Sequence, residues 1–194
     1  TTQKLSKNDE ILINKINSLG DNLALNLIED FFKNHGFQLL PLSSFLKDCS
    51  LPKGFYPEKK IFPSFQKYIL DSAEVGINLL NTISRFDVGQ SAVVSSKLVY
   101  AIEGQEGTDC MIDRAAYLSN KNKLITHPGP VLIKIPKINQ NINLDPPVVG
   151  FETVRKCIEN NFSSLVVSSN GTIIFELKKI MNLINAKNFV IYVV

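Results

Sequence analysis

GQSAVVSSKLVYAIEGQEGTDCMIDRAAYL, residues 89–118, indicates the architecture of this chain more clearly than any other stretch. Two β-rich runs separated by a serine pair predict two successive strands. The segment EGQEGTDCM, residues 103–111, then leads into a helical pattern, so a helix is expected to begin near Gly107. Strands followed directly by a helix predict helices packed on a mixed sheet, an α/β or α+β fold.

The sequence on both sides continues this alternation of helices and strands. Residues 8–35 and 64–84 carry apolar side chains at helical spacing, and the first of these helices is interrupted by LGDN at 19–22. The other predicted elements are, in chain order, a strand at 37–41, a strand at 129–137, a helix at 151–161, a hairpin at 164–176 that turns at Asn170-Gly171, a helix at 177–186 and a closing strand at 188–194. These elements predict a mixed sheet flanked by helices and preceded by a helical segment.

Residues 49–63, CSLPKGFYPEKKIFP, separate the first helical segment from the rest. Three prolines and a glycine without usable periodicity predict a linker. We therefore place a boundary at residue 54, with one unit over residues 1–54 and a second over residues 55–194.

Composition and charge disfavour several classes of protein. The net charge is +3 and the 21 lysines and arginines are dispersed along the chain, which makes nucleic acid a poor candidate for a partner. Three cysteines without CxxC spacing argue against a disulfide framework or a thiolate zinc site, and they favour a reducing compartment. The longest apolar runs are far shorter than the ~20 residues that a membrane-spanning helix needs.

Histidine chemistry and phosphate-loop chemistry are poorly represented in the sequence. His35 and His127 lie near expected turns and outside any known nucleophile motif, so we expect them to be structural or exposed to solvent. The sequence contains no HExxH, Walker A or GxGxxG motif. Carboxylates, lysines and amides remain as candidate functional groups.

The first candidate group lies at the expected start of the helix near residue 107. Asp109 follows Gly107 and Thr108, where free backbone N–H groups and the positive end of the helix dipole can hold a phosphate. The carboxylate of Asp109 could ligate Mg²⁺ or orient a water molecule. The alternative is that Thr108 or Asp109 only caps the helix.

A second candidate group follows the strand at 129–137. Lys134 and Lys137 lie at or just past the end of this strand. Gln140 and Asp145 occupy the loop after it, where open α/β sheets usually place ligand-binding residues. Lys134 is flanked by two isoleucines, so its side chain is expected on the opposite face of the strand. A lysine pair matches the charge of a diphosphate, and the alternative is a solvated strand edge.

A third candidate group is DVGQSAVV at residues 87–94. Gly89 gives the backbone room, and Gln90 offers a donor and an acceptor just before a strand. The alternative is a tight turn without a functional role. None of the three groups names a reaction by itself.

Taken in order, these motifs resemble the LpxI-type UDP-2,3-diacylglucosamine pyrophosphatases. The resemblance covers about residues 56–194 and is carried by DVGQSAVV, AIEGQEGTDCMIDRAA, GPVLIKIPKINQNINLDPPVVGFETV and LVVSSNGTIIFELKKIMNLINAKNFVIYV. The segment GDNLALNLIEDFFKNHGFQLL resembles the end of the family's N-terminal domain. Residues 1–54 are therefore expected to be the remainder of an N-terminal α/β domain plus a linker, and residues 55–194 a C-terminal, catalytic-type domain.

The resemblance implies metal-dependent hydrolysis of the diphosphate in UDP-2,3-diacylglucosamine, giving UMP and 2,3-diacylglucosamine 1-phosphate in lipid A biosynthesis. The family pattern GTDxM maps onto Gly107, Thr108, Asp109 and Met111, and KxxKxxQDxRxDxPxxG maps onto Lys134, Lys137, Gln140, Asp145 and Gly150. Two positions depart from the pattern. Asn141 stands where the family usually has Asp, and Asn143 where it usually has Arg, so one charge of each sign is lost.

This chemistry leads to specific expectations for the site. The expected catalytic residues are Asp109, Asp145, Lys134 and Lys137, and the expected substrate-binding residues are Gln90, Gly107, Thr108 and Gln140. Mg²⁺ or Mn²⁺ is expected on Asp109, Asp145 and Glu106, with Glu103 as a further candidate carboxylate. The acyl chains need an apolar groove, and helix faces could line it unless they belong to the core; the residues considered are Phe65, Tyr68, Ile69, Leu79 and Leu80.

The implied partners are a UDP-linked acylated sugar and, through this lipid substrate, the cytoplasmic membrane surface. The expected location is cytoplasmic and peripheral to the inner membrane, and a homodimer is left open. Two other classes of function also stay open. One is a non-catalytic module that binds a nucleotide or a phosphorylated ligand, for which the two asparagines would mark lost chemistry. The other is a structural assembly subunit that binds no ligand.

Overall fold

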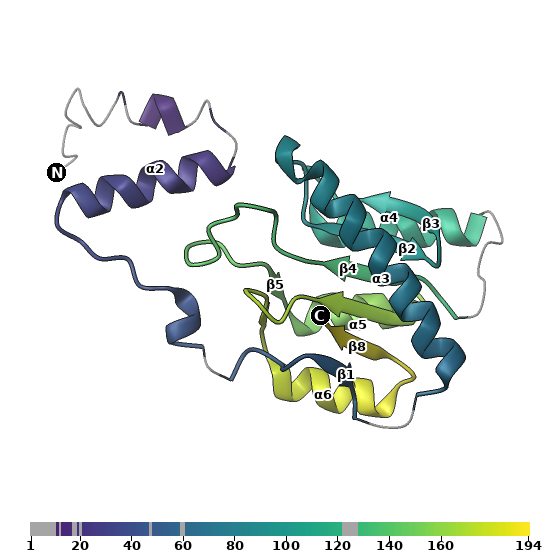
Figure 1. The fold of residues 1–194 in the computed structure, drawn as a ribbon. Coiled ribbons are helices and arrows are strands. Elements are labelled where there is room, and N and C mark those ends of the chain that lie inside the picture. Colours follow the sequence, from purple (N-terminus) through teal and green to yellow (C-terminus); the bar gives the residue numbers. More distant parts are fainter. Residues whose placement is uncertain are drawn as a thin grey trace, which may run out of the picture.

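The computed structural model describes residues 11, 13–16, 19, 21–46, 48–58, 61–121 and 128–194. The described residues form a six-stranded mixed sheet in the order β1-β8-β6-β4-β2-β3, with helices packed on both of its faces (Figure 1). The mixed fold predicted from the sequence, a sheet flanked by helices, is therefore confirmed.

The sheet has a parallel centre and antiparallel edges. β4 (Val131–Lys134), β6 (Ser164–Val167) and β8 (Val190–Val193) run parallel to one another. β2 (Ser91–Ser95) pairs antiparallel with β4 and forms a hairpin with β3 (Leu98–Ile102). Every residue of β4 and β6 is buried because helices cover both faces, which explains the nearly continuous apolar runs of these strands.

Helices divide the core into two apolar clusters. On one face, α3 (Pro63–Ile83) packs through Ile69, Ala73 and Leu80 against the sheet. On the other face, α4 (Gly107–Lys121), α5 (Phe151–Glu159) and α6 (Leu177–Ala186) contribute to a second cluster. Strand residues alternate between the two clusters, so Ile133 faces α3, and Lys134 lies on the α4 face as predicted.

The N-terminal region differs from the sequence-based expectation at one strand. α2 (Asp21–Asn34) forms where a helix was predicted, and residues 11 and 13–16 are also helical. The strand predicted at 37–41 is wrong. Phe37 and Leu40 stay largely exposed, and among the described residues no strand pairs with this segment. Without a partner, a short apolar run has no backbone hydrogen bonds to hold it as a strand.

The segment predicted as a linker contains a strand. β1 (Gly54–Tyr56) pairs antiparallel with β8 and forms one edge of the main sheet. Three residues are too few to show a side-chain period, so only the tertiary pairing reveals this strand. The division of the chain at residue 54 stays a prediction.

The hairpin predicted at residues 164–176 is also wrong. β6 lies between β4 and β8, whereas β7 (Ile173–Ile174) pairs in parallel with β5 (Val148–Val149) in a separate two-stranded sheet. The expected turn is present, with Gly171 at φ +92°. Because β6 already has a partner on each side, no edge is left for β7 to join.

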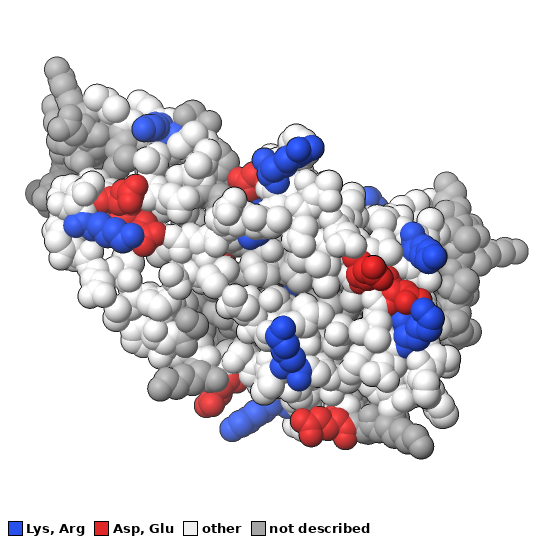
Figure 2. All heavy atoms as spheres, in the orientation of Figure 1, with Lys and Arg blue, Asp and Glu red and all other residues white. Residues whose placement is uncertain are grey.

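The described residues bear on the expectations for the histidines, the distribution of charge and membrane-spanning helices. His35 is exposed at the end of α2, and its Nδ1 lies 2.8 Å from the Phe31 carbonyl oxygen, whereas His127 lies outside the described residues. Figure 2 shows lysines and arginines interspersed with acids on the described part of one face. Within the described part of the chain, no helix is long and apolar enough to cross a membrane.

α3 approaches the sheet most closely at Gly76. A Cβ atom at this position would lie 2.7 Å from Cγ1 of Ile133, which is inside van der Waals contact. Glycine therefore lets the helix pack directly on β4, the strand whose carboxyl end lies at the candidate site.

We expect Gly76→Ala to lower the free energy of unfolding by about 1–3 kcal/mol, because the added methyl group overpacks this contact by more than the helix propensity of alanine returns. Urea unfolding measures the change. Gly150→Ala is the matched control, because a Cβ at Gly150 meets nothing within 4 Å. The control should lose less than about 1 kcal/mol as a helix cap. Equal losses at both glycines would contradict the close packing of α3.

Candidate functional site

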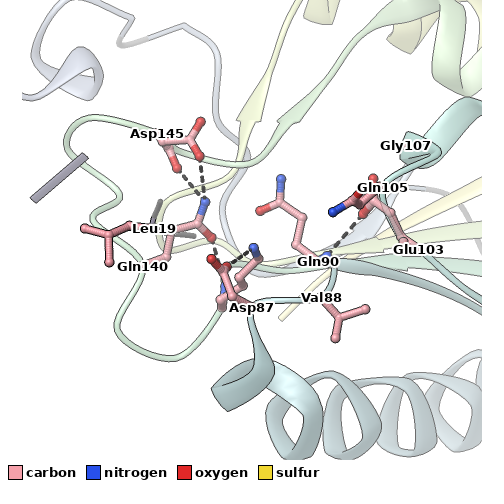
Figure 3. A pocket seen from close by; sticks show the side chains of 12 residues that line it. Leu19, Asp87, Val88, Gln90, Glu103, Gln105, Gly107, Gln140 and Asp145 are labelled. Carbon is pink, nitrogen blue, oxygen red and sulfur yellow. Dashed lines mark hydrogen bonds and ion pairs between the residues drawn. The ribbon is translucent and has the colours of Figure 1, made fainter. Parts of the chain in front are cut away.

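A polar cavity of about 380 Å³ opens near the end of β4 (Figure 3). Its lining comes from the turn at 87–90, the segment at 103–107 between β3 and α4, the loop at 137–145 after β4, and Leu19. This position, at the carboxyl end of a parallel strand, is where open α/β sheets usually bind ligands. The cavity is therefore lined by residues from each of the three candidate groups that the sequence separates.

Lys134 does not line the cavity, but Thr108 links it to Glu103 in the cavity wall. Its Nζ donates to Thr108 Oγ1 at 2.8 Å, and the same hydroxyl donates to Glu103 Oε1 at 2.6 Å. Lys134 and Glu103 are each only 8% exposed. A buried ammonium and a buried carboxylate are thus joined by one hydroxyl that satisfies both, as buried charged groups require. Thr108 links the end of β4 to the start of α4.

Glu103 is fixed from a second direction by the turn before β2. The backbone N–H of Gln90 donates to Glu103 Oε2 at 3.1 Å. A Cβ at Gly89 would lie 2.2 Å from the Glu103 carbonyl oxygen, so only glycine permits this approach. The side-chain oxygen of Gln90 is buried, and the described residues offer it no hydrogen-bond donor. Gln90 therefore lines the cavity, while its side-chain oxygen is buried without a partner among the described residues, and Gly89 lets the turn pack closely against Glu103.

The electrostatic surroundings of Lys134 show which carboxylates converge on it. Burial is the largest effect and lowers the pKa of Lys134, whereas the negative charges of Glu103, Asp109 and Asp145 raise it. These carboxylates come from the end of β3, the first turn of α4 and the loop after β4. Asp109 and Asp145 thus both influence the pKa of Lys134 through their charge, and their catalytic roles stay predictions.

The rim of the cavity is a chain of polar contacts in the loop after β4. Lys137 forms an ion pair with Asp87, and its backbone N–H donates to Gln140 Oε1 at 2.9 Å. Gln140 Nε2 donates to the Asp145 carbonyl oxygen at 2.6 Å and lies 3.3 Å from its carboxylate (Figure 3). Sequence reasoning missed Asp87. Its place two residues before Gly89, in a turn next to a strand, was the available signal.

Glu106 and Asp109 do not line the cavity with their carboxylates. Glu106 pairs with Arg114 at 2.5 Å and accepts from the Gly104 N–H at 3.1 Å. The hydrogen bond from Arg114 is the largest cause that lowers the pKa of Glu106. Asp109 is exposed at the start of α4 and is absent from the cavity lining.

A three-carboxylate metal centre is not assembled in the described part of the chain. Among these residues, no group of three or more His, Cys, Asp or Glu side chains is arranged to hold a metal ion. The combination of Asp109, Asp145 and Glu106 predicted as ligands is thus not preformed, because Glu106 is directed to Arg114. The requirement for Mg²⁺ or Mn²⁺ itself stays a prediction.

The apolar residues considered for an acyl groove belong to the core. Ile69 and Leu80 are buried in the cluster under α3, and Phe65, Tyr68 and Leu79 pack against it. The Tyr68 hydroxyl also donates to the Gly129 carbonyl oxygen at 3.0 Å. The alternative that these residues belong to the core is therefore confirmed, because the sheet covers the apolar face of α3.

The fold and the cavity define an α/β domain with a polar, lysine-containing site at the carboxyl end of a central parallel strand. The family model of the LpxI C-terminal domain matches residues 61–192, and the chain belongs to the LpxI family. The UDP-2,3-diacylglucosamine pyrophosphatase LpxI of Caulobacter vibrioides is 27% identical to this chain over 164 residues. The matched region is 84% of this chain and 57% of that protein, so the chain spans little more than half the length of this relative.

We expect Thr108→Val to lower the free energy of unfolding by about 1–3 kcal/mol, because valine keeps the shape of the side chain but removes the hydroxyl shared by Lys134 and Glu103. Thr108→Ser keeps the hydroxyl and should lose less than about 1 kcal/mol. Urea unfolding of the three proteins separates the two effects. A valine variant as stable as the wild type would contradict the role assigned to this hydroxyl.

Proposed function

We propose that the protein hydrolyses the diphosphate of UDP-2,3-diacylglucosamine to UMP and 2,3-diacylglucosamine 1-phosphate in lipid A biosynthesis. The name of the Caulobacter relative, a UDP-2,3-diacylglucosamine pyrophosphatase, supports the substrate. The observation that carries the proposal is the cavity, in which lysine charge, a carboxylate and an unsatisfied amide oxygen meet at the end of one strand.

The two lysines would neutralise the phosphates of the substrate. Lys137 lines the cavity, and Lys134 would supply a fixed positive charge from behind the cavity wall, where Thr108 links it to Glu103. Hydrolysis of a phosphoanhydride develops negative charge on phosphate oxygens, and preorganised cations in poorly hydrated surroundings stabilise that charge. The Asp87 carboxylate holds the Lys137 ammonium at the rim, where a phosphate would share or replace this contact.

Asp145 is the carboxylate best placed to orient the attacking water. It lines the cavity, and Gln140 holds it through the contacts at the rim. The water oxygen forms a bond to one phosphorus, the bond from that phosphorus to the bridging oxygen breaks, and a water proton leaves through the carboxylate. The Gln90 side chain lines the cavity, and its amide would bind a substrate hydroxyl or N–H group once the buried oxygen turns toward the ligand.

Asp145, which lines the cavity, would hold a magnesium or manganese ion that is shared with the substrate, and Asp109, exposed in the first turn of α4, is the second candidate ligand. Mg²⁺ in phosphate sites commonly uses one or two protein carboxylates and completes its coordination with phosphate oxygens and water. The negative charges of both carboxylates raise the pKa of Lys134, which supports a position for both near the end of β4. When bound, such an ion would supply further neutralisation of phosphate charge. Glu106 would take no part, because Arg114 engages it.

The acylated substrate would place the protein at the cytoplasmic surface of the inner membrane. The acyl chains cannot lie along the apolar face of α3, since the sheet already covers that face. Their binding surface therefore has to come from residues outside this cluster.

The proposal predicts Mg²⁺-dependent release of UMP from UDP-2,3-diacylglucosamine by the full-length protein. Asp145→Ala and Asp109→Ala should each lower kcat/KM by about 100-fold or more, the scale found when a group that stabilises the transition state is removed. Asp113→Ala is the matched control, because Asp113 lies one turn further along α4 and pairs with Lys156. Its activity should stay within about twofold of wild type.

Two results would contradict the assignment of the protein as a hydrolase. Binding of UDP without turnover would favour the non-catalytic module that holds a nucleotide or phosphorylated ligand. Absence of any thermal shift with UDP or the substrate would favour a structural subunit, because a ligand that binds only the folded state must raise its stability.

A further inference from the structure

Asn141 is the centre of the loop that carries the rim of the cavity. Its carbonyl oxygen accepts from the backbone N–H groups of Leu144 at 3.0 Å and Asp145 at 2.9 Å. Its side-chain oxygen accepts from the Asn143 N–H at 3.2 Å. These three bonds fold residues 141–145 into a compact turn, and the turn sets where the Asp145 carboxylate lies.

The other end of the Asn141 amide reaches a helix that is distant in the sequence. Asn141 Nδ2 donates to Glu29 Oε2 of α2 and lies 3.5 Å from Asn26 Oδ1. Figure 1 shows the loop between β4 and β5 extending toward α2. A backbone hydrogen bond from the Leu42 N–H to the Asn143 carbonyl oxygen, at 3.4 Å, joins the same loop to the segment that follows α2.

An amide suits this position because it donates and accepts at once. A carboxylate only accepts, so Asp at position 141 could keep the bond to the Asn143 N–H but would turn its second oxygen toward Glu29. The charge of Glu29 is secured by Lys33, whose Nζ lies 2.7 Å from it. The hydrogen bond from Lys33, and to a lesser extent that from Asn141, lowers the pKa of Glu29, so its carboxylate is charged at neutral pH.

We propose that Glu29 of α2 is a positioning residue, which holds the turn at 141–145 through the Asn141 amide and thereby fixes the side of the cavity formed by Gln140 and Asp145. α2, which lies outside the main sheet, then helps to shape the candidate site. The amide of Asn141 is matched to the carboxylate that faces it. The effect on substrate binding rests on the proposed function, whereas the coupling between α2 and the turn at 141–145 does not.

Amide hydrogen exchange of the full-length protein tests the coupling without any assay of activity. In Asn141→Asp, the Leu144 and Asp145 amides should exchange about tenfold faster than in wild type, because repulsion from Glu29 opens the turn. Adding Glu29→Gln should return both rates to within about twofold of wild type, because glutamine removes the repulsion. Glu29→Ala alone, a change outside the loop, should also speed both amides several-fold.

Asn143→Asp is the matched control for the added charge. Asn143 belongs to the same loop, but its side chain lines a separate hollow with Cys49 and Thr172. This variant should leave the exchange of Leu144 and Asp145 within about twofold of wild type. The proposal is overturned if Asn141→Asp exchanges like wild type, if Glu29→Gln fails to rescue it, or if Asn143→Asp accelerates exchange equally.

Steady-state kinetics then separate this proposal from the proposed function. If both hold, Asn141→Asp raises KM for UDP-2,3-diacylglucosamine more than it lowers kcat, and Glu29→Gln reverses the change. If the exchange rates respond but wild-type protein does not turn over the substrate, only the hydrolase assignment fails. If turnover is normal and the exchange rates do not respond, only the positioning role fails.

Discussion

The buried ammonium of Lys134 is the constraint on which the site depends. Removing a lysine from water costs several kcal/mol unless opposite charge and hydrogen bonds compensate for it. Here one hydroxyl, from Thr108, and one buried carboxylate, from Glu103, provide that compensation. The ends of β3 and β4 and the start of α4 must therefore meet at one point. Gly89 allows the turn before β2 to pack closely against this point.

This arrangement has a chemical consequence that a solvated lysine would lack. The positive charge of Lys134 is fixed through Thr108 to a carboxylate in the wall of a polar cavity, and a second cation, Lys137, lies at the rim. The loop that forms the rim is held in turn by a contact that reaches back to α2.

The sequence predicts the elements that have strong local patterns. Amphipathic periodicity reveals α3, and β-rich runs reveal β2, β3 and β4. The sequence does not predict elements whose formation depends on pairing with distant strands. β1 exists because the edge of β8 accepts it, and β6 and β7 separate because β4 and β8 occupy both sides of β6. Neither fact is encoded in a short window of residues.

The candidate site follows the same division. Lys134, Thr108, Gln90 and Asp145 could be singled out because they flank strand ends and a helix start, and the structure gathers them at one end of the sheet. Partnerships between distant residues could not be foreseen. Arg114 draws Glu106 away, Asp87 engages Lys137, and Glu29 meets Asn141, all through side-chain contacts that carry no sequence period.

Calorimetric titration of the full-length protein with UDP, comparing wild type with Lys134→Met, tests the central claim most directly. Methionine keeps the length of the side chain and removes its charge, and Lys97→Met, in the exposed turn between β2 and β3, is the control. We expect the dissociation constant to rise about tenfold or more in Lys134→Met, because a fixed positive charge near the phosphates is lost, while the control stays unchanged. An affinity for UDP that is the same in all three proteins would contradict the role of the buried ammonium.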